Sequence, residues 1–81
     1  MSYPLIVMVR PLEGYFIQLE YDNGEKKKFN VLPYISGPWY EELYNEKYFK
    51  TVHIVSQGKG IAWANGQDIA PHELYDMSIE G

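Results

Sequence analysis

Cysteine is absent from this sequence of 81 residues. No disulfide can therefore crosslink the chain, and zinc sites built from cysteine thiolates are excluded. The histidines, His53 and His72, lie far apart in the sequence and have no nearby pattern of acidic ligands, so we expect no structural metal and no cofactor. A chain of this length buries only about 60% of the surface that it exposes when unfolded, so its stability has to come from packing.

Basic residues are also scarce. The chain has 7 lysines and arginines against 11 acidic residues, which gives a net charge of −4. Nucleic-acid-binding domains normally carry a basic face because phosphate contacts dominate their affinity, and this chain has one basic cluster, Lys26–Lys28. We therefore expect no nucleic-acid binding by this domain alone, and the acidic balance suits a basic partner protein.

Long hydrophobic runs are missing as well. The apolar run Leu5–Val9 is too short for a signal-peptide core or a membrane span, and no positive charge precedes it. We expect no membrane association and a cytoplasmic location, with which the absence of cysteine agrees. Neither repeats nor linkers divide the chain, so residues 1–81 are predicted to form a single domain.

Aromatic residues, in contrast, are plentiful. The sequence contains 8 Tyr, 3 Phe and 2 Trp, which make up 16% of the chain. Each large ring can bury roughly 150–250 Å², so we expect most of them to form the core. Some tyrosines should remain exposed, where they would bind a partner protein or be covered in a homodimer.

The first half of the chain predicts three strands. Leu5–Arg10 is apolar at successive positions, which predicts a strand covered on both faces for part of its length. Tyr15–Tyr21 alternates apolar and polar residues, as a half-buried strand does. Asn23-Gly24 then favours a type I′ hairpin, and Lys26–Val31 is the return strand.

Alternation along that return strand gives its lysines a structural explanation. Phe29 and Val31 are expected in the core with Lys27 on their side, whereas Lys26 and Lys28 face solvent. The lysines would solvate the strand and discourage pairing with other chains. The alternative is that they contact an anion.

The middle of the chain predicts short helices. Pro38 suits a first helical position, and Trp39–Tyr44 follows with Trp39, Leu43 and Tyr40 expected to face inward. Asn45 is a good N-cap for a further helical turn over residues 46–49.

The last third predicts a second hairpin and a helix. Thr51–Ser56 and Ile61–Ala64 are the expected strands, with Ile61 and Trp63 inward, joined through Gln57–Gly60. Asn65-Gly66 should form a tight turn. Pro71 marks the start of a helix, in which Leu74, Tyr75 and Met77 should pack on the sheet, and the residues after it should fray.

The predicted order is therefore β-β-β-α-β-β-α. Strands grouped apart from two short helices indicate an α+β fold with a curled antiparallel sheet. The short connections between strands favour antiparallel neighbours.

The most unusual local string is Trp63-x-Asn65-Gly66-x-Asp68. One interpretation places Asn65 and Asp68 at the mouth of a cleft beside Trp63, where they would bind a small ligand. The structural interpretation is that Asn65 and Asp68 bond to backbone groups of turns and Trp63 lies in the core. Asp68 and His72 are spaced to meet as an acid–base pair, but no nucleophile accompanies them, so we expect no catalysis.

Acidic residues cluster near the first predicted helix. Glu41, Glu42 and Glu46 are expected to form a solvated face, or alternatively a docking patch for a basic partner. The residues predicted to contact a partner are aromatic or polar positions on this helix and around the Asn-Gly turn: Tyr34, Trp39, Tyr40, Glu41, Glu42, Trp63, Asn65 and Asp68.

Several strings together match a known family. They are Val7-x-Val9-Arg10-Pro11-Leu12, Tyr21-x-Asn23-Gly24-Glu25, Phe29-x-Val31-x-Pro33-Tyr34, Phe49-x-x-Val52, and Ile61-x-Trp63-x-Asn65-Gly66-x-Asp68-Ile69 with Pro71-x-x-Leu74-Tyr75. On these residues the chain resembles bacterial proteins of the DUF2442 family, a domain of unknown function. Ala64 departs from the family, which usually has proline at this position.

The resemblance implies no active-site residues, because no residues of this family are accepted as an active site. Some members carry an additional helix-turn-helix domain, which implies regulators, and others are short and encoded beside another small protein, as in a toxin–antitoxin pair. This chain is similar to the short type, so the resemblance implies a non-catalytic, antitoxin-like binding module. A nucleic-acid-linked accessory domain and a small-ligand-binding domain remain as alternatives.

Overall fold

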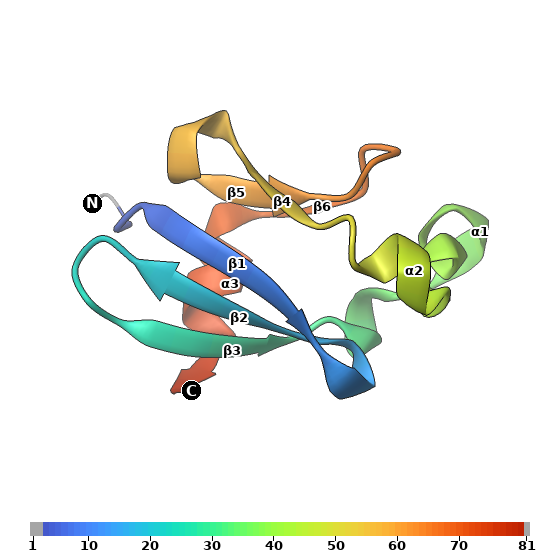
Figure 1. Cartoon of the computed structure of the whole chain (residues 1–81), viewed down its shortest axis with the longest axis horizontal. Helices are drawn as coiled ribbons and strands as arrows, with labels where there is room; N and C mark the ends of the chain where they lie inside the picture. The colour runs from blue at the N-terminus through green and yellow to red at the C-terminus, as the bar shows by residue number, and fades with distance from the viewer. Residues whose placement is uncertain (1–2, 81) are drawn as a thin grey trace.

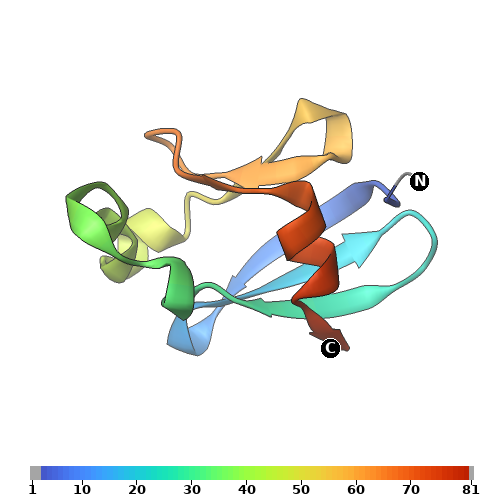
Figure 2. The same cartoon turned by 180° about the vertical axis from the view of Figure 1, so that it is seen from behind.

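The computed structural model describes residues 3–80, which form two antiparallel sheets with short helices between and across them (Figures 1 and 2). Sheet A has the strand order β1-β2-β3-β7, and sheet B has the order β4-β5-β6. The strands are β1 (Ile6–Leu12), β2 (Phe16–Tyr21), β3 (Lys26–Asn30), β4 (His53–Val55), β5 (Gly60–Ala62), β6 (Asp68–Ile69) and β7 (Ile79–Glu80). The α-helices are α1 (Gly37–Tyr40), α2 (Glu46–Phe49) and α3 (Pro71–Asp76), and the 3₁₀ turns are η1 (Glu13–Tyr15), η2 (Leu32–Tyr34), η3 (Glu41–Tyr44) and η4 (Ser56–Gly58).

Alternation along β2 and β3 places one face of sheet A in the core. Ile17, Leu19 and Tyr21 are buried, and the register pairs Ile17 with Phe29, so two buried side chains stand side by side. The lysine strand also has the predicted faces, with Phe29 buried and Lys26 exposed. These predictions are confirmed.

The hairpin between β2 and β3 has a different turn from the one predicted. Gly24 has a φ of 90°, but Asn23 is not among the residues with positive φ, so the turn is not type I′. The amide of Gly24 donates to the carbonyl of Tyr21 at 3.0 Å, and the amide of Tyr21 donates to the carbonyl of Glu25 at 2.9 Å. This is a three-residue loop whose glycine takes the left-handed position of a bulge.

β1 is covered less than its apolar sequence predicted. Val7 is 58% exposed, whereas Ile6 is buried and Val9 packs against the core. The strand continues through Pro11 to Leu12, because its pairing with β2 persists to the pair Leu12–Phe16. As an edge strand of sheet A, β1 has one face in the core and the other toward solvent.

The helical segment between the sheets is broken as expected at Asn45. The Asn45 side chain accepts a hydrogen bond from the amide of Lys47 at 3.0 Å, which confirms the N-cap of α2. Leu43 is fully buried, but Trp39 is 52% exposed, so its predicted inward orientation is wrong. The helix changes from α1 to the 3₁₀ geometry of η3 after Tyr40, and this change rotates Leu43 inward without Trp39.

The C-terminal elements cover sheet A and extend it. α3 begins at Pro71 and lies across one face of sheet A with Leu74 buried, as predicted (Figure 2). Met77 is exposed, contrary to the prediction. The residues expected to fray instead form β7, in which Ile79 pairs with Lys28, so β3 is not the free edge at this position.

Side chains from both sheets and from the helices form one core. Its buried members are Ile6, Ile17, Leu19, Tyr21, Phe29, Val31, Ile35, Leu43, Phe49, Ile61, Trp63, Ile69 and Leu74. The predicted α+β class and antiparallel pairing are confirmed. The single curled sheet is corrected to two sheets that are neither closed nor strongly curled, because the chain leaves sheet A after β3 and starts a separate meander at β4.

Gly58 joins the two sheets by a close backbone approach. It has a φ of 98°, and a Cβ atom built on it would lie 2.9 Å from the carbonyl oxygen of Ile6 and 3.2 Å from the Cβ of Leu5. The turn between β4 and β5 therefore rests directly on the start of β1, and any side chain at this position would force the two apart.

A tyrosine–carboxylate cluster attaches α3 to the first hairpin. The hydroxyl of Tyr75 donates to the carboxylate of Glu25, and the ammonium of Lys27 lies 4.0 Å from the Tyr75 ring centroid. This hydrogen bond, the bond from Asn23 and the nearby ammonium outweigh desolvation and hold the pKa of Glu25 below its ordinary value of 4.5. Burial, with the nearby Tyr75 and Glu25, raises the pKa of Tyr21 to about 12.

We predict that Gly58→Ala lowers the free energy of unfolding by about 2–5 kcal/mol, because it combines a left-handed backbone with a steric clash. Gly24→Ala is the matched control, since Gly24 also has a positive φ of 90° but has nothing within 4 Å of a built Cβ. Its cost should be about 1–2 kcal/mol. Urea unfolding of the two variants measures the difference, and equal losses would contradict the close approach.

We also predict that protonation of Glu25 destabilises the fold. Because the pKa of Glu25 is lower in the folded protein, its contribution to stability is fully present above pH 4.5. That contribution is lost as the pH falls through the folded pKa. Tyr75→Phe removes the largest cause of the lowered pKa. The variant should therefore lose less unfolding free energy than the wild type between about pH 6 and about pH 3. Chemical denaturation measures the unfolding free energy of both proteins against pH. Parallel profiles for the wild type and Tyr75→Phe would refute this role of the hydrogen bond.

Candidate functional site

Trp63 directly follows β5 and is the first residue of the string Trp63-x-Asn65-Gly66-x-Asp68. Its side chain is 1% exposed, and its indole Nε1 donates to the carbonyl of Phe49 at 2.9 Å. The ring packs on that of Phe49 with centroids 5.8 Å apart. Trp63 therefore attaches sheet B to the end of α2, and its indole is not available at the surface.

Asn65 bonds the β5–β6 turn to η3 and α2. Its side-chain Nδ2 donates to both carboxylate oxygens of Glu42, at 2.8 and 2.9 Å, and its backbone amide donates to the hydroxyl of Tyr48 at 2.7 Å. A charge-assisted hydrogen bond of this kind fixes the position of both partners. Asn65 and Glu42, both predicted to contact a partner, are brought together but are bonded to each other.

Gln67 completes this network from inside the protein. It is fully buried, and its Nε2 donates to the carbonyl of Trp39 at 2.8 Å and to the Glu42 carboxylate at 3.1 Å. Its Oε1 accepts a hydrogen bond from the hydroxyl of Tyr48 at 2.6 Å. Every polar atom of the amide thus has a partner, as a buried amide requires. We call Glu42, Tyr48, Asn65 and Gln67 the amide network.

Sequence reasoning missed Gln67, although the turn contained a usable signal. The amide of Trp63 donates to the carbonyl of Gln67 at 2.9 Å, which makes these two residues the paired ends of the hairpin loop. Directly paired residues project from the same face of a sheet. A buried Trp63 therefore places Gln67 in the interior, where its amide must find partners.

Three rings remain at the surface of the segment that the network holds. Trp39 is exposed, with its ring 5.4 Å from that of Tyr40 and close to Gly66. Tyr40 is half-buried and donates to the carbonyl of Asp68 at 3.3 Å, and Tyr44 is exposed. We call Trp39, Tyr40 and Tyr44 the aromatic surface. The segment that carries these rings, α1 with the following η3, lies at one end of the molecule, whereas β1 begins at the opposite end (Figure 1).

Exposed carboxylates flank the aromatic surface. Glu41 and Glu46 are exposed, and neither forms an ion pair within residues 3–80, where the ion pair found joins Lys27 to Glu25 at 3.8 Å. Glu42 is the member of the predicted acidic cluster whose carboxylate is used internally. Two carboxylates on this segment are thus left free to meet a cation.

Tyr34 and Asp68 lie differently from the other predicted residues. Tyr34 is half-buried and packs on Phe29 at 5.2 Å between centroids, and burial, followed by the nearby Glu73 carboxylate, raises its pKa. Asp68 contributes its backbone carbonyl to Tyr40, while its side chain is exposed. In the part of the chain that the structure describes, no hydrogen bond joins Asp68 to His72, and His72 is exposed.

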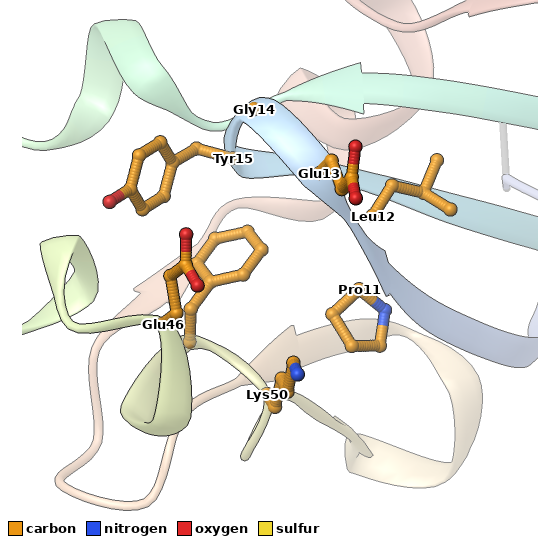
Figure 3. A pocket seen from close by; sticks show the side chains of 8 residues that line it. Pro11, Leu12, Glu13, Gly14, Tyr15, Glu46 and Lys50 are labelled. Carbon is orange, nitrogen blue, oxygen red and sulfur yellow. The ribbon is translucent and has the colours of Figure 1, made fainter.

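Two hollows in the part of the chain that the structure describes lie away from Trp63 and Asp68. One, of about 380 Å³, lies between the β1–β2 connection and α2 (Figure 3). A second, more open hollow lies near the N-terminal end of β1 and is lined by Tyr3, Pro4, Leu5, Asp22, Lys59 and Pro71. Neither of these two hollows is lined by Trp63, Asn65 or Asp68, so neither is the cleft that the small-ligand interpretation of the string requires.

Residues 3–80 contain no cluster of three or more histidine, aspartate or glutamate side chains arranged to hold a metal ion. Within the same range, no helix has the length and apolar character needed to cross a membrane.

Comparison with protein-family models matches residues 6–80 to the model described as Protein of unknown function (DUF2442). Searches of curated proteins and of solved structures find no match to the chain.

We predict that Gln67→Leu lowers the free energy of unfolding by about 1–3 kcal/mol, because it removes the side-chain donor to the Trp39 carbonyl and the acceptor of the Tyr48 hydroxyl proton. Gln18→Leu is the control, because Gln18 is half-buried on β2 and its side chain makes no hydrogen bond within residues 3–80. It should change stability by less than about 0.5 kcal/mol. Thermal or urea unfolding compares them, and a harmless Gln67→Leu would show that the network contributes nothing.

Proposed function

The chain belongs to the DUF2442 family of proteins of unknown function, and we propose that it is a non-catalytic module that binds a basic partner protein through the aromatic surface. The partner would be a second small protein in a two-protein system, of which this chain is the neutralising, antitoxin-like member. Such a pair would act in the cytoplasm.

The observation that carries this proposal is the exposure of Trp39 on a fixed backbone. Its side chain is 52% exposed, while its carbonyl accepts a hydrogen bond from the buried amide of Gln67 at 2.8 Å. Tryptophan and tyrosine are the residues most enriched at the energetic centres of protein interfaces. A ring on an ordered backbone loses little conformational entropy on binding, so it contributes more affinity than a mobile one.

Charge favours a basic partner. The chain carries a net charge of −4, and Glu41 and Glu46 lie on the same segment as the exposed rings. Carboxylates at the rim of an apolar patch accelerate the encounter with a positively charged surface and select against acidic ones.

The alternatives receive less support from the geometry. Asn65 and Glu42, the polar groups beside Trp63, bond to each other, so a ligand would have to compete with these bonds. For nucleic acid, Lys27 is engaged by Glu25 and the Tyr75 ring, which leaves Lys26 and Lys28 as the exposed cations of the basic cluster. Two cations would give weak, strongly salt-dependent phosphate binding.

The test is co-expression with the protein encoded by the adjacent gene, followed by size-exclusion chromatography with light scattering. We expect a stable complex that Trp39→Ala weakens at least about thirty-fold, which is the effect of losing an interface residue worth about 2 kcal/mol. Light scattering of the chain alone tests the homodimer at the same time.

Val7→Ala is the matched control, because Val7 is 58% exposed but lies on β1, away from the aromatic surface. It should leave the complex intact. A wild-type chain that forms no complex, or a complex that both variants weaken equally, would overturn the proposal.

A further inference from the structure

The hollow between the β1–β2 connection and α2 adjoins the aromatic surface. It is lined by Pro11, Leu12, Glu13, Gly14, Tyr15, Glu46, Phe49 and Lys50. Figure 3 shows the β1 side contributing Pro11 to Tyr15 and the helix side contributing Glu46 and Lys50, with the Glu46 carboxylate directed toward the loop at Gly14 and Tyr15. We call it the Tyr15 pocket.

Aromatic groups form the fixed wall of the Tyr15 pocket. The rings of Tyr15 and Phe49 meet edge to face, with centroids 5.4 Å apart and planes at 87°. The hydroxyl of Tyr15 donates to the carbonyl of Tyr44 at 2.6 Å, so the wall is hydrogen-bonded directly to the aromatic surface. Tyr15 has a φ of 64°, and this left-handed backbone sets the direction in which its ring leaves the chain.

Charge in the Tyr15 pocket is unbalanced. Glu13 and Glu46 supply two carboxylates and Lys50 supplies one ammonium, and none of the three is ion-paired within residues 3–80. The lining therefore has an excess of one negative charge next to the half-buried ring of Tyr15, which the buried Phe49 supports from behind. A carboxylate combined with an aromatic face attracts a cation, and a guanidinium in particular, because it is planar and weakly hydrated.

We propose that the Tyr15 pocket receives an arginine side chain, which on the proposed function is supplied by the basic partner docked on the aromatic surface. The guanidinium would pack against the Tyr15 ring and bond to the Glu46 carboxylate. Lys50 would oppose this binding and limit its strength. The Tyr15 pocket would thus add a contact that selects for positive charge to the apolar contact made by the aromatic surface.

The probe is N-acetyl-arginine amide, titrated into the uniformly ¹⁵N-labelled chain, with N-acetyl-citrulline amide as the neutral compound of the same shape. We expect chemical-shift changes from the arginine compound that concentrate at Gly14, Tyr15, Phe49 and Lys50 and weaken as salt is added. The citrulline compound should bind more weakly. Equal binding of both compounds, or shifts spread over the whole chain, would overturn the proposal.

Charge variants test the sign of the interaction. Glu46→Gln should weaken binding of the arginine compound about two- to five-fold, the range for a partly exposed charge pair, and Lys50→Gln should strengthen it by a similar factor. Glu80→Gln is the control, because Glu80 is exposed on β7 outside the pocket and should leave the affinity unchanged. The opposite order, with Lys50→Gln weakening the binding, would mean that the pocket prefers anions and would refute the assignment.

The pocket and the proposed function can fail separately. Binding of the arginine compound without any complex with the co-expressed protein would remove the proposed function and leave the pocket. A complex that Trp39→Ala disrupts but that Glu46→Gln and Lys50→Gln do not change would retain the proposed function and exclude the pocket from the interface.

Discussion

The hydrogen bonds of the Gln67 side chain are the constraint on which the arrangement of this protein depends. Gln67 is a fully buried polar residue, and its amide reaches the carbonyl of Trp39, the carboxylate of Glu42 and the hydroxyl of Tyr48. A buried amide that lost these partners would lose the free energy of its hydration without compensation. The short helices of residues 37–49 are too short to be stable by themselves. They are therefore held by the side chain of Gln67 in the β5–β6 turn, together with the bonds of Asn65 and Trp63.

This constraint explains why large rings stay at the surface. With the backbone of Trp39 and the carboxylate of Glu42 both attached to sheet B, the side of the segment that faces inward is already filled by Leu43 and Tyr48. Trp39 and Tyr44 are left on the outer side. The same bonds that stabilise the interior thus present the aromatic surface and hold the carbonyl of Tyr44 where it accepts a hydrogen bond from the Tyr15 hydroxyl.

The parts of the fold that could be predicted from the sequence are those with local causes. The N-cap at Asn45, the helix start at Pro71 and the alternation along β2 follow from residues within a few positions of each other. The exposure of Trp39 and the hydrogen bond that Gln67 makes to it could not be predicted in this way, because they result from contacts between segments 28 positions apart. The pairing of β7 with β3 and the division into two sheets are similarly non-local.

The candidate site also combines features that the sequence predicts locally with features that depend on non-local contacts. Asn65 and Glu42 were both predicted to contact a partner, and the structure brings them into contact with each other in a bond that serves the fold. The Tyr15 pocket combines residues 11–15 with residues 46–50, whose proximity depends on how α2 packs against the β1–β2 connection. No spacing within either segment predicts this meeting.

The most direct test of the amide network compares hydrogen exchange at the two Asn-Gly turns. The amide of Asn65 donates to the hydroxyl of Tyr48 at 2.7 Å, whereas the amide of Asn23, in the equivalent position of the other turn, donates no hydrogen bond within residues 3–80. We expect the Asn65 amide to exchange at least about ten times more slowly than the Asn23 amide, a difference of about 1.4 kcal/mol. Equally fast exchange at both amides would contradict it, because the network would then not hold the segment in solution.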